Sequence, residues 1–227
     1  MLNSELIQEI RDEQQAQFDA PKSSLQKVLQ SISNVFHPML VMSYVALALC
    51  VFSPLSCLPM VIKAYFVGQV FFYTMLLPLL AIALMHVFHV VGHWALRDRR
   101  DRVLPLLVNV ICYGLNAYVL THEGFLPNWV LMFFYGAVVL AAIVWIISIW
   151  WKISAHAAAD ASFATVALAL GLYFPDQMPL WMELLAILVV GVVSSIRVYL
   201  GRHTLAQVGY GALLGVFSVS AGMALWG

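Results

Sequence analysis

Long apolar runs, each close to the length of a membrane-crossing helix, constrain the fold of this chain more than any other feature. A bilayer core needs roughly 20 apolar residues per helix, and a backbone inside lipid satisfies its own hydrogen bonds only in helices or closed barrels. Runs of this kind occupy most of the 227 residues: 35–57, 61–96, 103–120, 126–151, 156–174, 180–200 and 204–226. The pattern predicts an all-α, polytopic transmembrane helix bundle with six or seven spans.

The composition agrees with this fold class. Apolar residues make up 63% of the chain and charged residues only 10%, a balance that is foreign to soluble domains. The eleven basic and eleven acidic residues cancel, so the overall charge indicates no nucleic-acid partner. We expect an integral membrane protein whose first partner is the bilayer itself.

Prolines and the polar N-terminal residues set the expected organisation. Pro38 and Pro54 interrupt the first run, which leaves six or seven spans open, and Pro78 predicts a kink or tilt in the overlong second run. Residues 1–34 form a polar N-terminal segment, in which apolar residues from Leu25 to Ile32 recur at helical spacing and predict an interfacial helix. Residues 35–227 form the expected transmembrane domain.

Polar residues gather at the ends of the predicted spans. Two spans separate each cluster from the next, so all three clusters return to one membrane face and can converge on one pocket. Basic residues on one face also fit the ordinary positive-inside rule, which is the alternative explanation for the arginine run. The clusters are residues 97–102 (Arg-Asp-Arg-Arg-Asp-Arg), then Lys152, Ser154, His156 and Asp160, and finally Arg197, Arg202, His203 and Gln207.

The positive-inside rule does not explain why His156 and His203 lie beside basic residues at the start of predicted helices. Phosphoryl chemistry needs fixed positive charge for the phosphate oxygens, a nucleophile and a proton donor. Guanidinium groups and two imidazoles in one pocket supply all three. A histidine taken alone in a membrane helix is more often a packing residue, so the inference depends on the clusters acting together.

The order of these residues resembles the type-2 phosphatidic acid phosphatase superfamily of membrane lipid phosphatases, in a divergent bacterial branch. Its usual motifs are Lys-x6-Arg-Pro, Pro-Ser-Gly-His and Ser-Arg-x5-His-x3-Asp. Here Arg197-x5-His203 keeps the third spacing, with Ile196 at the Ser position and Gln207 at the Asp position. Ile153-Ser154-Ala155-His156 keeps Ser and His of the second. In the first, Pro105 places Arg97 at the Lys position and Leu104 at the Arg position, with Arg102 as the natural substitute.

The resemblance implies a metal-independent membrane enzyme without cofactors that hydrolyses a lipid phosphate monoester or pyrophosphate in the bacterial inner membrane. In this reading His203 forms a phosphohistidine and His156 serves first as acid and then as base. Arg197 completes the catalytic set with Gln207. The residues expected to hold the phosphate oxygens are Arg97, Arg99, Arg102, Lys152 and Ser154. The lipid, the membrane face of the site and the oligomeric state stay open.

Gln207 and Asp160 each have two readings. Gln207 lies four residues after His203 and can accept a hydrogen bond from its ring, but Thr204-x-x-Gln207 also fits a helix capping box. Asp160 lies four residues after His156, on the same helical face. It could tune that imidazole or make a structural hydrogen bond.

Two rival functions remain. One is a metal or haem enzyme, because His86, His89 and His93 lie on one face of the predicted second helix, a spacing that suits ligands. Membrane di-iron hydroxylases, however, need more histidines than the seven in this chain. The other rival is a noncatalytic lipid-binding or transport protein on the same scaffold, because several motif positions are degenerate.

Overall fold

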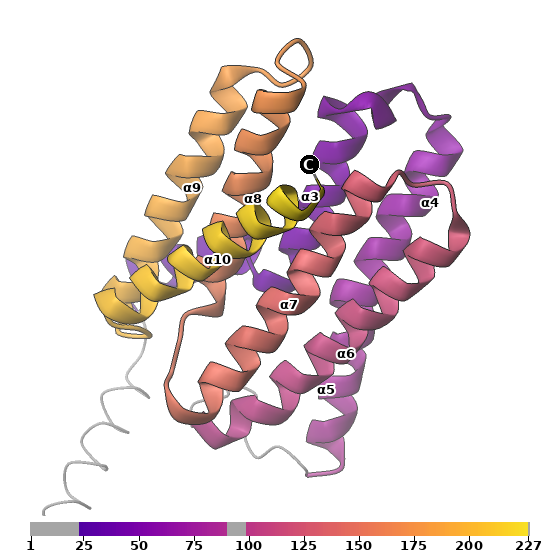
Figure 1. The fold of residues 1–227 in the computed structure, drawn as a ribbon. Helices are drawn as coiled ribbons and strands as arrows, with labels where there is room; N and C mark the ends of the chain where they lie inside the picture. Colours follow the sequence, from indigo (N-terminus) through magenta and orange to yellow (C-terminus); the bar gives the residue numbers. More distant parts are fainter. Residues whose placement is uncertain (1–22, 90–98, 227) are drawn as a thin grey trace, which may run out of the picture.

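The computed structural model describes residues 23–89 and 99–226, and all regular structure in these ranges is helical (Figure 1). Six helical segments are long and apolar enough to cross a membrane, which confirms the predicted all-α transmembrane bundle. The long second span, Met60–Val87, contains α4 (Met60–Phe71) and α5 (Leu77–Val87). The other helices with spans are α6 (Arg99–Glu123), α7 (Asn128–Trp150), α8 (Ala155–Tyr173), α9 (Leu180–Tyr199) and α10 (Leu205–Trp226).

The first apolar run begins with an elbow. Helices α2 (Ser24–Val35) and α3 (Pro38–Phe52) meet at an angle of 51°. Counting this bent pair raises the possible spans from six to seven. Helix α3 packs against α4, α7 and α8, and the short 3-10 helix η1 (Pro54–Cys57) follows it.

The second apolar run forms one continuous helical segment, Met60–Val87, which we call the α4–α5 rod. Five residues, Phe72–Leu76, form a π-helical turn (η2) between α4 and α5. Pro78 follows at the start of α5 and has no N–H to donate to the preceding turn, and a π turn is one way to accommodate such a break. The Thr74 hydroxyl donates to Val70 O over 2.8 Å and lies 3.3 Å from Met39 O, so the turn is also tied to α3. Pro78, where the sequence predicts a kink or tilt, is thus preceded by a widened turn.

Helices α8 and α10 make the closest contact in the bundle. In Figure 1, α10 crosses obliquely in front of α7 and α8, and it packs on both. A Cβ atom built on Gly211 would lie 2.6 Å from Ser154 O, and one on Gly215 would lie 2.2 Å from Ala158 O. Only hydrogen fits at these positions, and small residues four apart are typical of helices that pack this closely in membranes. The close approach fixes the first turns of α8 against α10.

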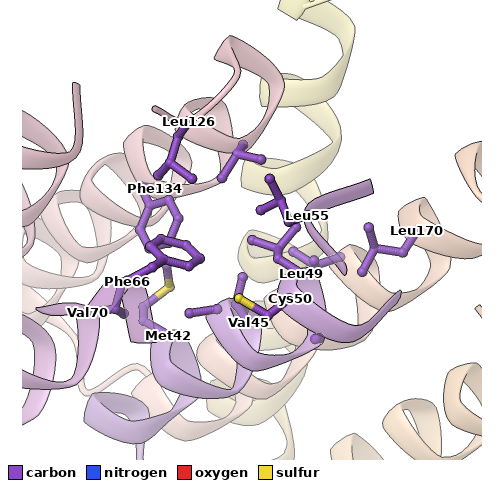
Figure 2. Close-up of a cluster of buried hydrophobic side chains, with 14 of the residues drawn as sticks. Met42, Val45, Leu49, Cys50, Leu55, Phe66, Val70, Leu126, Phe134 and Leu170 are labelled. Carbon is purple, nitrogen blue, oxygen red and sulfur yellow. The ribbon is translucent and has the colours of Figure 1, made fainter. Parts of the chain in front are cut away.

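The main apolar core lies between α3, α4, α7 and α8 (Figure 2). The rings of Phe66 and Phe134 meet edge to face with centroids 5.8 Å apart. Side chains from α3 pack around them, and Val45 and Leu49 are almost completely buried. This core holds α3 in the middle of the bundle and so positions the α2–α3 elbow.

Candidate active site

A cavity of about 430 Å³ opens among the helix ends on one side of the bundle. Arg102 reaches it from the first turns of α6 and His156 from the first turn of α8. Arg197 comes from the last turn of α9, and Arg202 and His203 come from the link between α9 and α10. None of the described residues that line the cavity is acidic. The three polar clusters therefore do converge, and they form a site suited to an anion.

Two helix caps create the spacing between Arg197 and His203. Helix α9 ends in a Schellman motif: Gly201 has φ +64°, Arg202 N donates to Arg197 O over 3.0 Å, and Gly201 N donates to Val198 O over 2.9 Å. Thr204, the residue after His203, is the N-cap of α10. The five residues between Arg197 and His203 are thus the number needed to end α9 and to turn the chain toward the N-cap of α10.

Gln207 makes both contacts that its sequence position allows. Its Oε1 atom accepts from Thr204 N over 3.1 Å, and Gln207 N donates to Thr204 Oγ1 over 3.3 Å, which completes a capping box. The same Oε1 lies 3.2 Å from His203 Nδ1. An amide oxygen only accepts, and it has two lone pairs. Neutral His203 therefore carries its proton on Nδ1 and keeps Nε2 free as a nucleophile.

The surroundings of His203 keep its ring neutral. Burial, followed by the positive charges of Arg197, Arg102 and Lys152, lowers its pKa from 6.5 to about 4, and the hydrogen bond to Gln207 opposes part of that shift. Burial and the nearby arginines, chiefly Arg102 and Arg202, also lower the pKa of Lys152. Four cationic side chains thus lie close enough together around His203 to interact electrostatically: Arg102, Lys152, Arg197 and Arg202.

Arg197 lies in the last turn of α9, and its side chain contacts α2. Its side chain is only 8% exposed, and Nη1 lies 3.4 Å from the hydroxyl of the fully buried Ser33. Arg197 Nε has no partner among the described residues. An unused, buried guanidinium N–H that belongs to a cavity wall is available to a bound oxyanion.

His156 and Asp160 are both buried, but their side chains are not hydrogen-bonded to each other. The His156 side chain makes no hydrogen bond within the described part of the chain, and neither Asp160 nor any other acidic residue lines the cavity. One carboxylate oxygen of Asp160 has no partner among the described residues. Neither reading offered for Asp160, tuning His156 or a structural hydrogen bond, has a contact to support it here.

The predicted site residues divide into four groups. His203, His156, Arg197 and Arg102 line the cavity together. Gln207 stands behind His203. Lys152 and Ser154 do not line the cavity; the Ser154 hydroxyl accepts from Ala157 N over 3.4 Å and caps α8. Arg97 and the side chain of Arg99 lie outside the described residues.

Sequence reasoning missed one whole wall of the cavity. Gln30 and Asn34 from α2 and His37 from the elbow all line it. Gln30 Nε2 donates to Asn34 Oδ1 over 2.9 Å. The spacing 30, 34, 37 is that of one helical face, so this polar stripe was the signal that could have identified the wall.

The expected three-histidine face on the second helix is wrong for the part that the structure describes. Helix α5 ends at Val87, and His89 has φ +56°, which takes it out of the helix that carries His86. His93 lies outside the described residues. Among the described residues, no three His, Cys, Asp or Glu side chains are grouped to hold a metal ion.

The cavity continues from its charged end into the apolar layer of the bundle. Tyr113 lines it eleven residues after Arg102 on α6, which corresponds to a depth of roughly 16 Å along the helix. Its inner walls are largely apolar and come from α3, α6 and α7, with Met42, Leu106, Leu140, Ala141 and Val144 among them. The site can therefore enclose an anionic group together with part of an apolar chain.

No family model, curated protein or solved structure matches this chain. The geometry of the cavity and the three short motifs are therefore the features that point to a function.

Proposed function

We propose that this protein is a membrane phosphatase that hydrolyses a lipid phosphate monoester or pyrophosphate through a phosphohistidine intermediate. One observation carries the proposal: a single cavity has arginines and three histidines at one end and apolar walls beyond them. A charged headgroup on an apolar tail is the ligand that complements both ends. The resemblance to the type-2 phosphatidic acid phosphatases adds support, and we place the protein in a bacterial inner membrane on that basis.

In the first half-reaction His203 Nε2 attacks the phosphorus. The bond from phosphorus to the leaving oxygen breaks as the P–N bond forms, and protonated His156 gives its proton to that oxygen. Arg102, Arg197 and Arg202 stabilise the charge on the nonbridging oxygens. Gln207 accepts from Nδ1–H throughout and keeps the ring aligned.

In the second half-reaction water replaces the histidine. His156, now neutral, takes a proton from water as the oxygen attacks phosphorus and the P–N bond breaks. The sum is one phosphoester and one water converted into one alcohol and inorganic phosphate. For a pyrophosphate, the alcohol is replaced by the remaining lipid monophosphate.

The decisive experiment compares purified wild-type protein with His203→Ala in detergent micelles. We expect wild type to release inorganic phosphate from a lipid phosphate and to trap acid-labile phosphate on His203. The variant should lose about 10³-fold or more of the turnover. Because guanidinium groups supply the positive charge, turnover should survive EDTA. Lipid binding by wild type without any turnover would instead favour the noncatalytic lipid-binding alternative.

A further inference from the structure

His37 is the cavity residue for which the proposed reaction has no role. It lies at the α2–α3 elbow, far in the sequence from the three motifs, and it lines the same cavity as His156. The two imidazole rings meet edge to face, with centroids 5.2 Å apart and planes 83° apart. This is a direct contact with the expected proton donor.

His156 needs such a contact. A general acid transfers its proton efficiently only when its ring is held in one orientation, and a histidine usually gains that orientation from a hydrogen bond to its second nitrogen. Within the described residues the His156 side chain makes no hydrogen bond, and its aromatic contact is the ring of His37. Ring packing therefore takes the place of the usual hydrogen bond.

His37 is itself well anchored. It is the N-cap of α3, with extended backbone angles before Pro38, and its Nδ1 accepts from Met39 N over 3.3 Å. The Tyr113 hydroxyl donates to Pro38 O over 3.1 Å and ties the elbow to α6. The ring of His37 is thus a fixed surface against which His156 can rest.

We propose that His37 is a positioning residue, whose ring holds His156 in the orientation for proton transfer to and from the leaving and attacking oxygens. The role rests on the proposed phosphatase function, since it assigns His37 to that reaction. It also gives the α2–α3 elbow a part in the site.

Two variants separate the ring of His37 from its cap. His37→Phe keeps an aromatic ring but loses the cap acceptor, whereas His37→Asn keeps a good N-cap but loses the ring. Turnover is measured with a lipid alkyl phosphate, whose leaving oxygen needs a proton, and with a 4-nitrophenyl phosphate, whose leaving group does not.

We expect His37→Asn to lower kcat on the alkyl phosphate by about tenfold or more, which is part of the contribution of general acid–base catalysis. The first-turnover burst of nitrophenolate, which precedes the base-catalysed hydrolysis, should stay within about threefold of wild type. His37→Phe should restore most of the alkyl phosphate activity. Equal losses on both substrates, or a Phe variant as poor as the Asn variant, would overturn the positioning role.

A second measurement does not depend on turnover. In NMR spectra of protein with labelled histidines, the His156 ring should have the shifts of a single orientation in wild type and in His37→Phe, and averaged shifts in His37→Asn. An unchanged His156 signal in His37→Asn would refute the proposal. If wild type hydrolyses neither substrate, the phosphatase function fails while this spectrum still decides whether His37 positions His156.

Discussion

Helix α8 and the α4–α5 rod are both long enough to cross a bilayer, but the rest of the protein buries a much larger share of α8. In the most apolar window of each, 56% of the residues of α8 are buried, against 17% for Met60–Val87. Helix α8 holds His156 and Asp160 in buried positions, whereas Lys63 and His86 of the rod are only partly buried. Polar groups are tolerated at membrane depth where neighbouring helices cover them. The covered helix is therefore the one that can hold chemistry.

A matched pair of histidines tests this difference most strongly. His156→Gln should lower kcat/KM on a lipid phosphate by about 10²- to 10⁴-fold, because it removes the proton donor. His86→Gln in α5 should remain within about twofold, since His86 is not among the residues that line the cavity. Steady-state kinetics on the two purified variants make the comparison. Equal losses would show that α8 has no special part in the reaction.

A matched pair of glycines tests the packing. Gly215→Ala would place a Cβ 2.2 Å from Ala158 O and 2.9 Å from Ser162 N, and overpacking of this kind costs about 1–3 kcal/mol. Gly68 in α4 has nothing within 4 Å of an added Cβ, so Gly68→Ala should be neutral or stabilise the helix by up to about 1 kcal/mol. Unfolding in detergent measures both free energies. A Gly215→Ala protein as stable as wild type would contradict the close contact between α8 and α10.

A matched pair of capping boxes separates catalysis from capping at the start of α10. Gln207→Leu removes the capping contact and the hydrogen bond to His203, and we expect about a tenfold loss in kcat/KM together with a capping loss of about 1 kcal/mol. Gln26→Leu breaks the equivalent box of Ser23 and Gln26 at the start of α2. That control should lose stability by a similar amount and keep its activity. A similar loss of activity in Gln207→Leu and Gln26→Leu would show that Gln207 serves only as a helix cap.

The smallest expected effect concerns the charge of His203. Because its pKa is lowered to about 4, the ring stays neutral on acidification from pH 7 to pH 5 and gains its proton only near pH 4. Lys152→Ala removes one of the positive charges that lower this pKa, so the midpoint should rise toward 6.5. An NMR titration of His203 measures both values. A wild-type midpoint near 6.5 would mean that the cavity charges do not reach the ring.

The features that the sequence predicted well are local ones. Six long spans follow from apolar runs whose length matches the bilayer, and Arg197-x5-His203 is recognisable because two adjacent caps fix its length. The convergence of Arg102 with His156 followed from counting spans, since each pair of spans returns the chain to the same face.

The features that escaped prediction depend on tertiary contacts. The sequence predicted a break at Pro38 with a separate helix before it, but not the 51° angle between α2 and α3 or the packing of α3 against three neighbours. His37 escaped notice for the same reason, since its partner lies 119 positions away in the sequence.

The two caps between α9 and α10 also bear on how chains of this design can diverge. Gly201 ends one helix and Thr204 begins the next, so adding or removing a residue between them disrupts both caps and turns His203 away from Arg197. The link between α8 and α9, at the opposite end of these helices, has no part in the cavity, so a change in its length leaves the two caps and His203 in place. Related proteins should therefore differ in length at 174–179 long before they differ at 201–204, and evolutionary variation in substrate should enter through the walls of the cavity.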